Sequence, residues 1–182
     1  MNVHDKLFIG GEWVAPEGKG VIEVISPHSE EVIGTVPDAS TADIDKAIAA
    51  ARNAFDNGPW PKMSPEERGE GIKRLSAALS SRAQDIADLI SAQNGSPKSW
   101  SIMGQVFSAT MVLDTYANLA SGFNWEEERT GALGSPVRVR RAPVGVAAGI
   151  IPWNVPLFIC ALKLGPAMAA GCPIVLKPAP ET

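Results

Sequence analysis

The chain has 182 residues, of which 45% are hydrophobic and 20% are charged. This composition is that of a globular protein, and it excludes disordered, collagen-like and coiled-coil chains. The 16 basic and 20 acidic residues give a net charge of −4, so there is no basic excess with which to bind nucleic-acid phosphates. With two cysteines and two histidines, no Cys/His metal centre is expected.

The N-terminus reads Met-Asn-Val-His-Asp-Lys and lacks the charged and then apolar pattern of a signal segment. The weakly polar stretch from Ala142 to Ala161 contains three prolines, which break a membrane helix. Cys160 and Cys172 lie in apolar surroundings, which is typical of reduced thiols. We therefore expect a soluble, cytoplasmic protein that binds neither nucleic acid nor a membrane.

The first forty residues have the pattern of short strands. Leu7–Ile9 and Glu12–Val14 flank Gly10-Gly11, and a Gly-Gly pair supplies the positive φ angles of a tight hairpin turn. Val21–Ile25 and Val32–Val36 have the pattern of two further strands. We expect an outlying sheet that braces a larger fold.

Helical patterns begin after this sheet. Apolar residues between Ile44 and Phe55 repeat at a spacing of three and four, and Asn57-Gly58-Pro59 ends that helix. Ser64 is the predicted N-cap of the next helix, since Pro65 fits its first position and Glu67 completes a capping box.

Two more helices are predicted further along. One contains Ile86, Leu89 and Ile90 and stops at Asn94-Gly95. The other starts at Ser96-Pro97 and ends near Gly122. Four large residues on it recur at helical spacing and are predicted to point inward: Trp100, Met103, Phe107 and Met111.

The last third changes to an α/β pattern. Residues 125–134 read as a polar loop, and Val137–Arg141 alternates like a strand with one wet face. Val144–Ile151 is apolar on both faces, which predicts a buried parallel strand. A helix over Pro156–Gly171 then leads to a second buried strand, Pro173–Lys177, so a βαβ unit is expected. Because the chain stops just after this strand, we expect it to be the front portion of a longer protein.

The loop Ile151–Pro156 is the first candidate site. In open α/β sheets, ligands bind outside the carboxyl ends of the strands, and this loop follows such an end. Two prolines stiffen it, and the Asn154 amide is a neutral donor suited to a developing oxyanion. The alternative is that Asn154 only caps the following helix. Spacing does not distinguish the two.

Two lysines and two cysteines are the other candidates for chemistry. Lys177 closes the second strand at the same edge, where it either donates to hydroxyls or phosphates or only marks the exit to solvent. Lys163 lies in an apolar helix and must snorkel or find a partner. Neither Cys160 nor Cys172 has a neighbouring base, so both are predicted to be structural.

Five stretches resemble the amino-terminal part of the aldehyde dehydrogenase superfamily, in the same order and at the same spacing over nearly the whole chain. Pro152-Trp153-Asn154-Val155-Pro156 followed by Val175-Leu176-Lys177-Pro178 is a highly specific pair. The remaining three are Phe8-Ile9-Gly10-Gly11-Glu12-Trp13, Pro143-Val144-Gly145-Val146 and Lys163-Leu164-Gly165-Pro166-Ala167.

The resemblance implies an α/β fold with a Rossmann-like cofactor domain, an outlying β-hairpin, a helical layer and part of a β oligomerisation arm. Residues 1–124 and 144–182 would belong to the amino-terminal part of the cofactor domain, and residues 125–143 to the arm. The catalytic domain would lie outside this chain. The full-length protein would form a homodimer or homotetramer.

The implied activity is oxidation of an aldehyde substrate to a carboxylic acid with NAD(P), through a cysteine thiohemiacetal and thioester. Asn154 matches the oxyanion-hole asparagine, and Lys163 matches a lysine implicated in proton relay. Lys177 matches the lysine that reaches the adenosine ribose. The loop that lines the nicotinamide side matches Ile151, Pro152 and Trp153.

Three departures limit what carries over. A glutamate usually lies three residues after the lysine; here that position is Pro180 and Glu181 follows, so NAD is expected with NADP as the alternative. Val155 replaces a residue that is often aromatic, which leaves the aldehyde class open. The family's nucleophilic cysteine and general-base glutamate lie far downstream, so the 182-residue chain alone is predicted to be inactive. The alternative is a non-catalytic binding or assembly module of the same fold.

Overall fold

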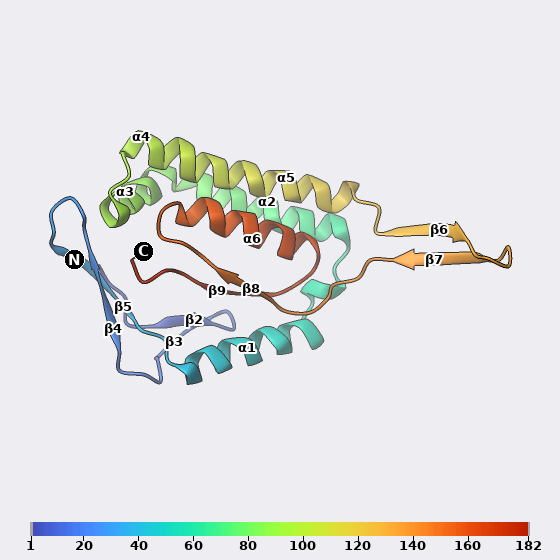
Figure 1. The fold of residues 1–182 in the computed structure, drawn as a ribbon, viewed down its shortest axis with the longest axis horizontal. Helices are drawn as coiled ribbons and strands as arrows, with labels where there is room; N and C mark the ends of the chain where they lie inside the picture. The colour runs from blue at the N-terminus through green and yellow to red at the C-terminus, as the bar shows by residue number, and fades with distance from the viewer. Residues whose placement is uncertain (1, 182) are drawn as a thin grey trace.

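The computed structural model describes residues 2–181 and shows an α/β structure with long helices and short strands (Figure 1). No helix in this described range is long and apolar enough to cross a membrane. The elements are, in chain order, β1 (Asn2–Val3), β2 (Leu7–Ile9), β3 (Glu12–Val14), β4 (Val21–Ile25), β5 (Val32–Pro37), α1 (Thr41–Asp56), the 3-10 helix η1 (Trp60–Lys62), α2 (Pro65–Ser81), α3 (Ala83–Asn94), α4 (Lys98–Trp100), the π-helical segment η2 (Ser101–Phe107), α5 (Ser108–Gly122), β6 (Glu126–Thr130), β7 (Pro136–Arg140), β8 (Ala147–Ile150), α6 (Pro156–Ala169) and β9 (Ile174–Lys177).

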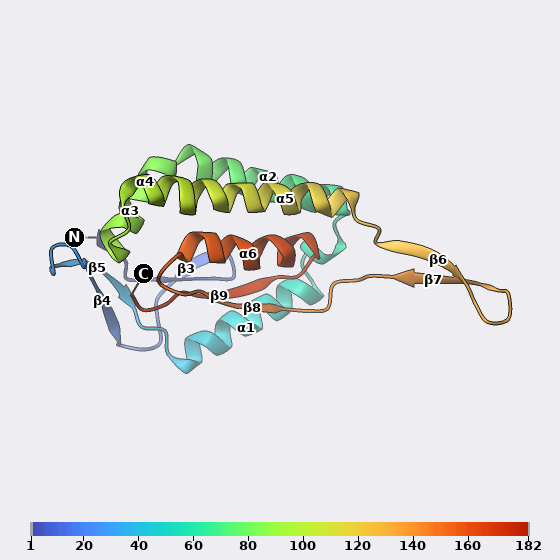
Figure 2. The ribbon, with the colours of Figure 1, turned by 45° about the horizontal axis from the view of Figure 1, so that its top comes forward.

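The main body is layered. Helices α2 and α5 lie side by side above α6, and the β8–β9 sheet lies between α6 and α1 (Figures 1 and 2). The helices approach closely, since a Cβ added to Gly69 of α2 would lie 2.7 Å from the carbonyl oxygen of Ala117 in α5. The hydrophobic core between the three helices is formed by Ile72, Ala109, Leu113, Ala117, Ala120, Ala161 and Ala169.

The predicted start of α2 is confirmed. Ser64 Oγ accepts from the N–H of Glu67 at 3.2 Å, and the N–H of Ser64 donates to the Glu67 carboxylate at 2.7 Å. Pro65 occupies the first helical position, where its missing N–H costs nothing. The predicted stops after α1 and α3 are also confirmed, at Asn57 and at Gly95.

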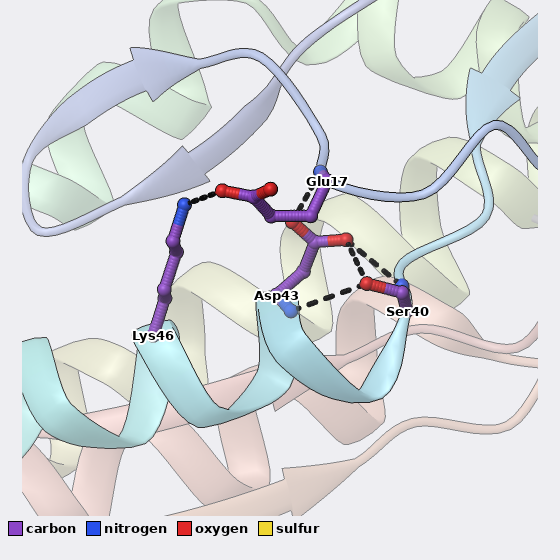
Figure 3. Close-up of polar contacts among 4 residues, drawn as sticks. All are labelled: Glu17, Ser40, Asp43 and Lys46. Carbon is purple, nitrogen blue, oxygen red and sulfur yellow. Dashed lines mark hydrogen bonds and ion pairs between the residues drawn. The ribbon is translucent and has the colours of Figure 1, made fainter.

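A second capping box starts α1 and also ties the N-terminal segment to the helix (Figure 3). Asp43 is 1% exposed, and its carboxylate accepts from the N–H of Glu17 at 2.8 Å and from the N–H and hydroxyl of Ser40 at 2.9 and 2.7 Å. The Glu17 and Ser40 donors hold the pKa of Asp43 at about 2. Lys46 forms an ion pair with the Glu17 side chain. We call these four residues the Asp43 corner.

The predicted inward face of the fourth long helix is wrong. Trp100, Met103, Phe107 and Met111 are 53%, 59%, 55% and 53% exposed. The buried face instead combines small and polar side chains with Val106 and Leu113, and its alanines allow α2 to approach closely. The π-helical segment η2 also adds residues per turn, which rotates the side chains before Phe107 relative to those after it. The buried set includes Ser101, Gln105, Val106, Ala109, Thr110 and Leu113.

The strands near the N-terminus form as predicted. β2 and β3 pair as an antiparallel hairpin, and Gly10 and Gly11 have φ of 64° and 90°. β4 and β5 pair antiparallel, and β1 adds to β5 in parallel. The β2–β3 hairpin lies beside α1, and the β4–β5 sheet lies at the end of the body where the C-terminus also lies (Figure 1).

Residues 125–134 are not simply a loop, which corrects the sequence prediction. Glu126–Thr130 forms β6 and pairs antiparallel with β7, and this hairpin projects from the body (Figures 1 and 2). The cross-strand pairs explain how so polar a segment forms a strand. Arg138 lies 3.7 and 3.9 Å from the Glu126 and Glu128 carboxylates, and Arg140 lies 3.2 Å from Glu126.

The βαβ unit is confirmed in its pairing, since β8 and β9 are parallel and joined by α6. The prediction of a strand buried on both faces over Val144–Ile151 is wrong. The strand spans only Ala147–Ile150, and the Val144 and Ile150 side chains are 94% and 75% exposed. Within the described residues the sheet has two strands, so α6 and α1 cover only part of β8.

Candidate functional site at the edge of the parallel strands

The carboxyl ends of β8 and β9 meet, as the sequence predicted. Ile150 is the register partner of Lys177, and the N–H of Ile151 donates to the carbonyl of Lys177 at 3.0 Å. The strand ends and the loop from Ile151 to Val155 form what we call the strand edge. In open α/β sheets this is the position at which ligands bind.

Asn154 does not cap α6, which excludes the structural alternative for it. The N-cap is Val155, which makes no side-chain capping bond, and Pro156 opens the helix. Asn154 is exposed, and no hydrogen bond within residues 2–181 involves its side-chain amide. The amide therefore retains its full capacity to donate to a ligand oxygen.

The other loop residues are arranged around Asn154. Ile151 is 3% exposed and anchors the loop in the body, whereas the Trp153 ring is 53% exposed. Pro152 is half-buried. The loop thus has one buried anchor, a proline on each side of Trp153 and Asn154, and two side chains directed away from the core.

Asn94, which the sequence pattern indicates only as part of a helix end, lies at the end of α3 and also contacts this loop. Its Nδ2 donates to the main-chain carbonyls of Trp153 at 3.3 Å and Asn154 at 3.4 Å. The contact spans about sixty residues of sequence, so no local pattern indicates it. An Asn-Gly helix end was the only signal, and it is shared by many helices that bind nothing.

The two predicted lysines lie on different elements of the unit. Lys177 is exposed at the end of β9, and its Nζ donates to the carbonyl of Pro178 at 3.0 Å. Lys163 is exposed on α6, and its Cδ would lie 3.5 Å from a Cβ added to Gly149 of β8. The Lys163 stem therefore lies over the sheet with its head outward, which is the snorkelling arrangement of the two alternatives.

Pro180 and Glu181 lie in the turn that follows β9, and both are exposed. Pro180 has no carboxylate to offer a ribose hydroxyl. Glu181 carries the only carboxylate in this turn among the described residues, one position further from Lys177. The negative charge in this turn therefore lies four residues after Lys177, at Glu181, and not three residues after it, where Pro180 lies.

Both cysteines have the structural character that was predicted. Burial raises the pKa of the Cys160 thiol, and Cys172 is 5% exposed. The raised pKa favours the protonated form of the Cys160 thiol, which is a poor nucleophile. Among residues 2–181, no three His, Cys, Asp or Glu side chains come together in a way that could hold a metal ion.

Two surface hollows lie at the base of the β6–β7 hairpin and contain none of the predicted site residues. One is lined mainly by apolar side chains of α5 and α6, including Tyr116 and Leu119. The other is lined in part by Lys62, Arg68 and Arg140. Arg68 already donates to the carbonyls of Ala169 and Met63, at 2.9 and 2.6 Å, so it supports the fold.

The chain as a whole matches a known enzyme family. The aldehyde dehydrogenase family model matches residues 13–182, and the chain belongs to that family. Its structure is similar to that of an aldehyde dehydrogenase of Mycobacterium tuberculosis complexed with NAD+, with a TM-score of 0.95 and 44% sequence identity. The match covers 100% of this chain and 37% of the other. The fold is therefore that of the amino-terminal part of an aldehyde dehydrogenase.

Named relatives give the same picture. Geranial dehydrogenase of Castellaniella defragrans is 39% identical over 181 residues, covering 98% of this chain and 37% of the relative. Betaine aldehyde dehydrogenase of Bacillus subtilis is 36% identical over 176 residues, covering 97% and 36%. The chain thus spans little more than a third of the length of these relatives.

Proposed function

We propose that these residues form the cofactor-side part of an NAD(P)-dependent aldehyde dehydrogenase that oxidises an aldehyde to a carboxylic acid. The observation that carries the proposal is the Asn154 amide, which has no hydrogen-bond partner in the described part of the chain and lies on a proline-flanked loop at the carboxyl edge of two parallel strands. The family membership and the NAD+ complex of the Mycobacterium tuberculosis relative support it.

In the proposed reaction, a cysteine thiolate outside these 182 residues adds to the aldehyde carbonyl, which forms a thiohemiacetal oxyanion. The Asn154 amide donates to that oxyanion and stabilises its charge. NAD+, held by the strand-edge residues, would supply the acceptor for the hydride that leaves the same carbon. The resulting thioester is hydrolysed by water, which releases the acid and restores the thiol. Cys160 and Cys172 take no part.

The strand edge fits a dinucleotide. Lys177 is exposed, and its ammonium group has three donors, of which only one is directed at Pro178. The remaining donors are available for ribose hydroxyls, and Pro152 and Trp153, anchored by the buried Ile151, would line the nicotinamide side. Since Pro180 leaves out a negative charge that would repel a 2′-phosphate, we propose NAD as the cofactor with NADP tolerated.

Lys163 is proposed to assist proton transfer, because its head leaves the sheet beside Gly149 while its stem is held in place. The β6–β7 hairpin, within residues 125–143, is proposed as an oligomerisation arm that joins a homodimer or homotetramer. Its projection from the body and its unpaired outer edges support that role (Figure 2). Residues 1–124 and 144–182 form the cofactor-binding part, and a cytoplasmic location is proposed.

The test is an Asn154→Ala variant of the polypeptide as it occurs in the cell. Losing one oxyanion donor should lower kcat/KM by about 10²–10³, while the dissociation constant for NAD+ changes little. Asn118→Ala is the matched control, since Asn118 is exposed on α5 and makes no side-chain hydrogen bond among the described residues. Near-wild-type turnover, under conditions where hydride transfer limits the rate, would contradict the proposal.

A further inference from the structure

The loop that carries Asn154 is held from outside its own βαβ unit at one point. Asn94 Nδ2 donates to the Trp153 and Asn154 carbonyls, at 3.3 and 3.4 Å. No other hydrogen bond in the described range joins residues 152–154 to another element. Two consecutive peptide planes of the loop are therefore fixed by a single side-chain amide.

The Asn94 amide is itself oriented. Its Oδ1 accepts from the N–H of Ser96 at 3.0 Å, so the NH₂ group of the same amide is turned toward the loop. Gly95 allows this turn because it has φ of 76°, a left-handed conformation that costs other residues energy. The acceptor and donor halves of one side chain thus perform two separate tasks.

Asn94 also lies on a firmly packed helix. Ile90, one turn before it, is 5% exposed, and the Ser91 hydroxyl lies 3.0 Å from the hydroxyl of fully buried Ser101. Ser101 opens the π-helical segment η2, which packs on both α3 and α6. The end of α3 is therefore a fixed reference point against which the loop is set.

We propose that Asn94 is a positioning residue that sets the Asn154 amide at the place where the oxyanion forms. This inference rests on the proposed function of Asn154. Asn94 does not touch the reacting atoms; it holds the two peptide planes that determine where the Asn154 side chain starts. Donors are required at this position, because the two groups that face it are carbonyl oxygens.

The decisive variant is Asn94→Asp in the full polypeptide. A carboxylate keeps the acceptor for the Ser96 N–H and so preserves the helix end, but it replaces the donors with oxygens that repel the two carbonyls. We expect kcat to fall about tenfold to a hundredfold, because misplacing a catalytic donor costs that much. The KM for aldehyde and the dissociation constant for NAD+ should stay within about twofold. Gln93→Ala, on the adjacent residue of α3, is the matched control.

The double variant Asn94→Asp/Asn154→Ala separates positioning from general damage. If Asn94 acts only through Asn154, the double variant should be no slower than Asn154→Ala alone. Additive losses would overturn the positioning role, as would a wild-type kcat in Asn94→Asp. An active Asn154→Ala enzyme would instead overturn the proposed function itself, so the two failures are distinguishable.

Hydrogen exchange of the loop gives a readout that does not depend on activity. The peptide covering residues 150–156 should exchange faster in Asn94→Asp than in wild type, while peptides of α2 and α5 remain unchanged. Equal exchange in the loop would overturn the proposal. If Asn94→Asp fails to fold, Asn94→Ala removes the donors without adding a charge, and the same two measurements apply to it.

Discussion

At the Asp43 corner, the buried Asp43 carboxylate accepts three hydrogen bonds of 2.7 to 2.9 Å. At the strand edge, the half-buried Asn94 amide donates two hydrogen bonds, of 3.3 and 3.4 Å, to the main chain of the loop. Both sites join segments far apart in the sequence through side-chain contacts to the main chain. At the Asp43 corner every polar side chain is paired (Figure 3). At the strand edge the Asn154 side-chain amide has no hydrogen-bond partner among residues 2–181.

The difference separates a site that stabilises the fold from a site that presents a reactive group. Short bonds to a charged, buried acceptor resist opening and contribute to stability. The longer hydrogen bonds that the neutral Asn94 amide donates near the surface contribute less to stability, but they set the orientation of the loop. Variants at the corner should therefore change unfolding, and variants at the edge should change binding and rate.

The largest effect on stability is expected for Asp43→Ala. This change leaves the Glu17 and Ser40 donors without an acceptor in a buried place, so the unfolding midpoint should fall by roughly 5–10 °C. Thermal denaturation followed by circular dichroism measures it. Asp45→Ala is the control, since Asp45 is exposed on the same helix. Equal midpoints for the two variants would show that Asp43 stabilises the fold no more than an exposed aspartate does.

The contribution of the Asp43 carboxylate to stability should depend on pH. The pKa of Asp43 is lowered to about 2 in the folded chain, below its ordinary value near 3.8, so its contribution to stability is complete above that ordinary value. As pH falls from about 4 through 2, the contribution is lost. Denaturant titrations should therefore show a steeper loss of stability in wild type than in Asp43→Asn over that window. Parallel curves would show that Asp43 titrates normally.

Lys177→Ala should change cofactor binding without changing unfolding. A hydrogen bond from a charged group to ribose is worth about tenfold to a hundredfold in the dissociation constant. Calorimetric titration of NAD+ and NADP+ into the full polypeptide measures it, with Lys19→Ala, another exposed lysine, as control. Because Pro180 leaves out a charge near the ribose 2′ position, discrimination against NADP+ should be weak. Unchanged affinity for both would show that Lys177 only faces solvent.

The smallest effect is expected on the projecting hairpin. Arg138 is exposed and lies 3.7 and 3.9 Å from two carboxylates, so Arg138→Gln should shift the unfolding midpoint by less than about 2 °C. The shift should disappear in about 1 M salt, because surface ion pairs are screened there. A large shift that persists in salt would show that the ion pairs of the hairpin stabilise the fold as strongly as the Asp43 corner does.

The local patterns predicted most of the elements. Ser64, Pro65 and Glu67 form the predicted capping box, and Gly10-Gly11 turns the predicted hairpin. These features depend on residues within about four positions of one another, so the sequence contains all that is needed. The β8–α6–β9 order likewise predicted that Lys177 and the Asn154 loop meet at one edge, since parallel strands must end on the same side.

Which face of a helix is buried was decided only by the tertiary structure. Trp100, Met103, Phe107 and Met111 form a regular apolar stripe, yet they lie outside, because α2 packs against the alanine-rich face of α5. Periodicity detects that a stripe exists but not which neighbour meets it. The strand β6 was missed for a related reason: its glutamates are held in a sheet by arginines of β7.

The same division holds at the site. The sequence by itself determined that an asparagine lies between two prolines after a parallel strand, and that a lysine ends the next strand. Only the structure decided that Asn154 does not cap α6 and that Asn94 of α3 donates hydrogen bonds to the loop that carries Asn154. Local motifs are stabilised by bonds between neighbours in the chain, whereas the Asn94 contact depends on where α3 lies relative to the Asn154 loop, and the packing of the whole helical layer sets that distance.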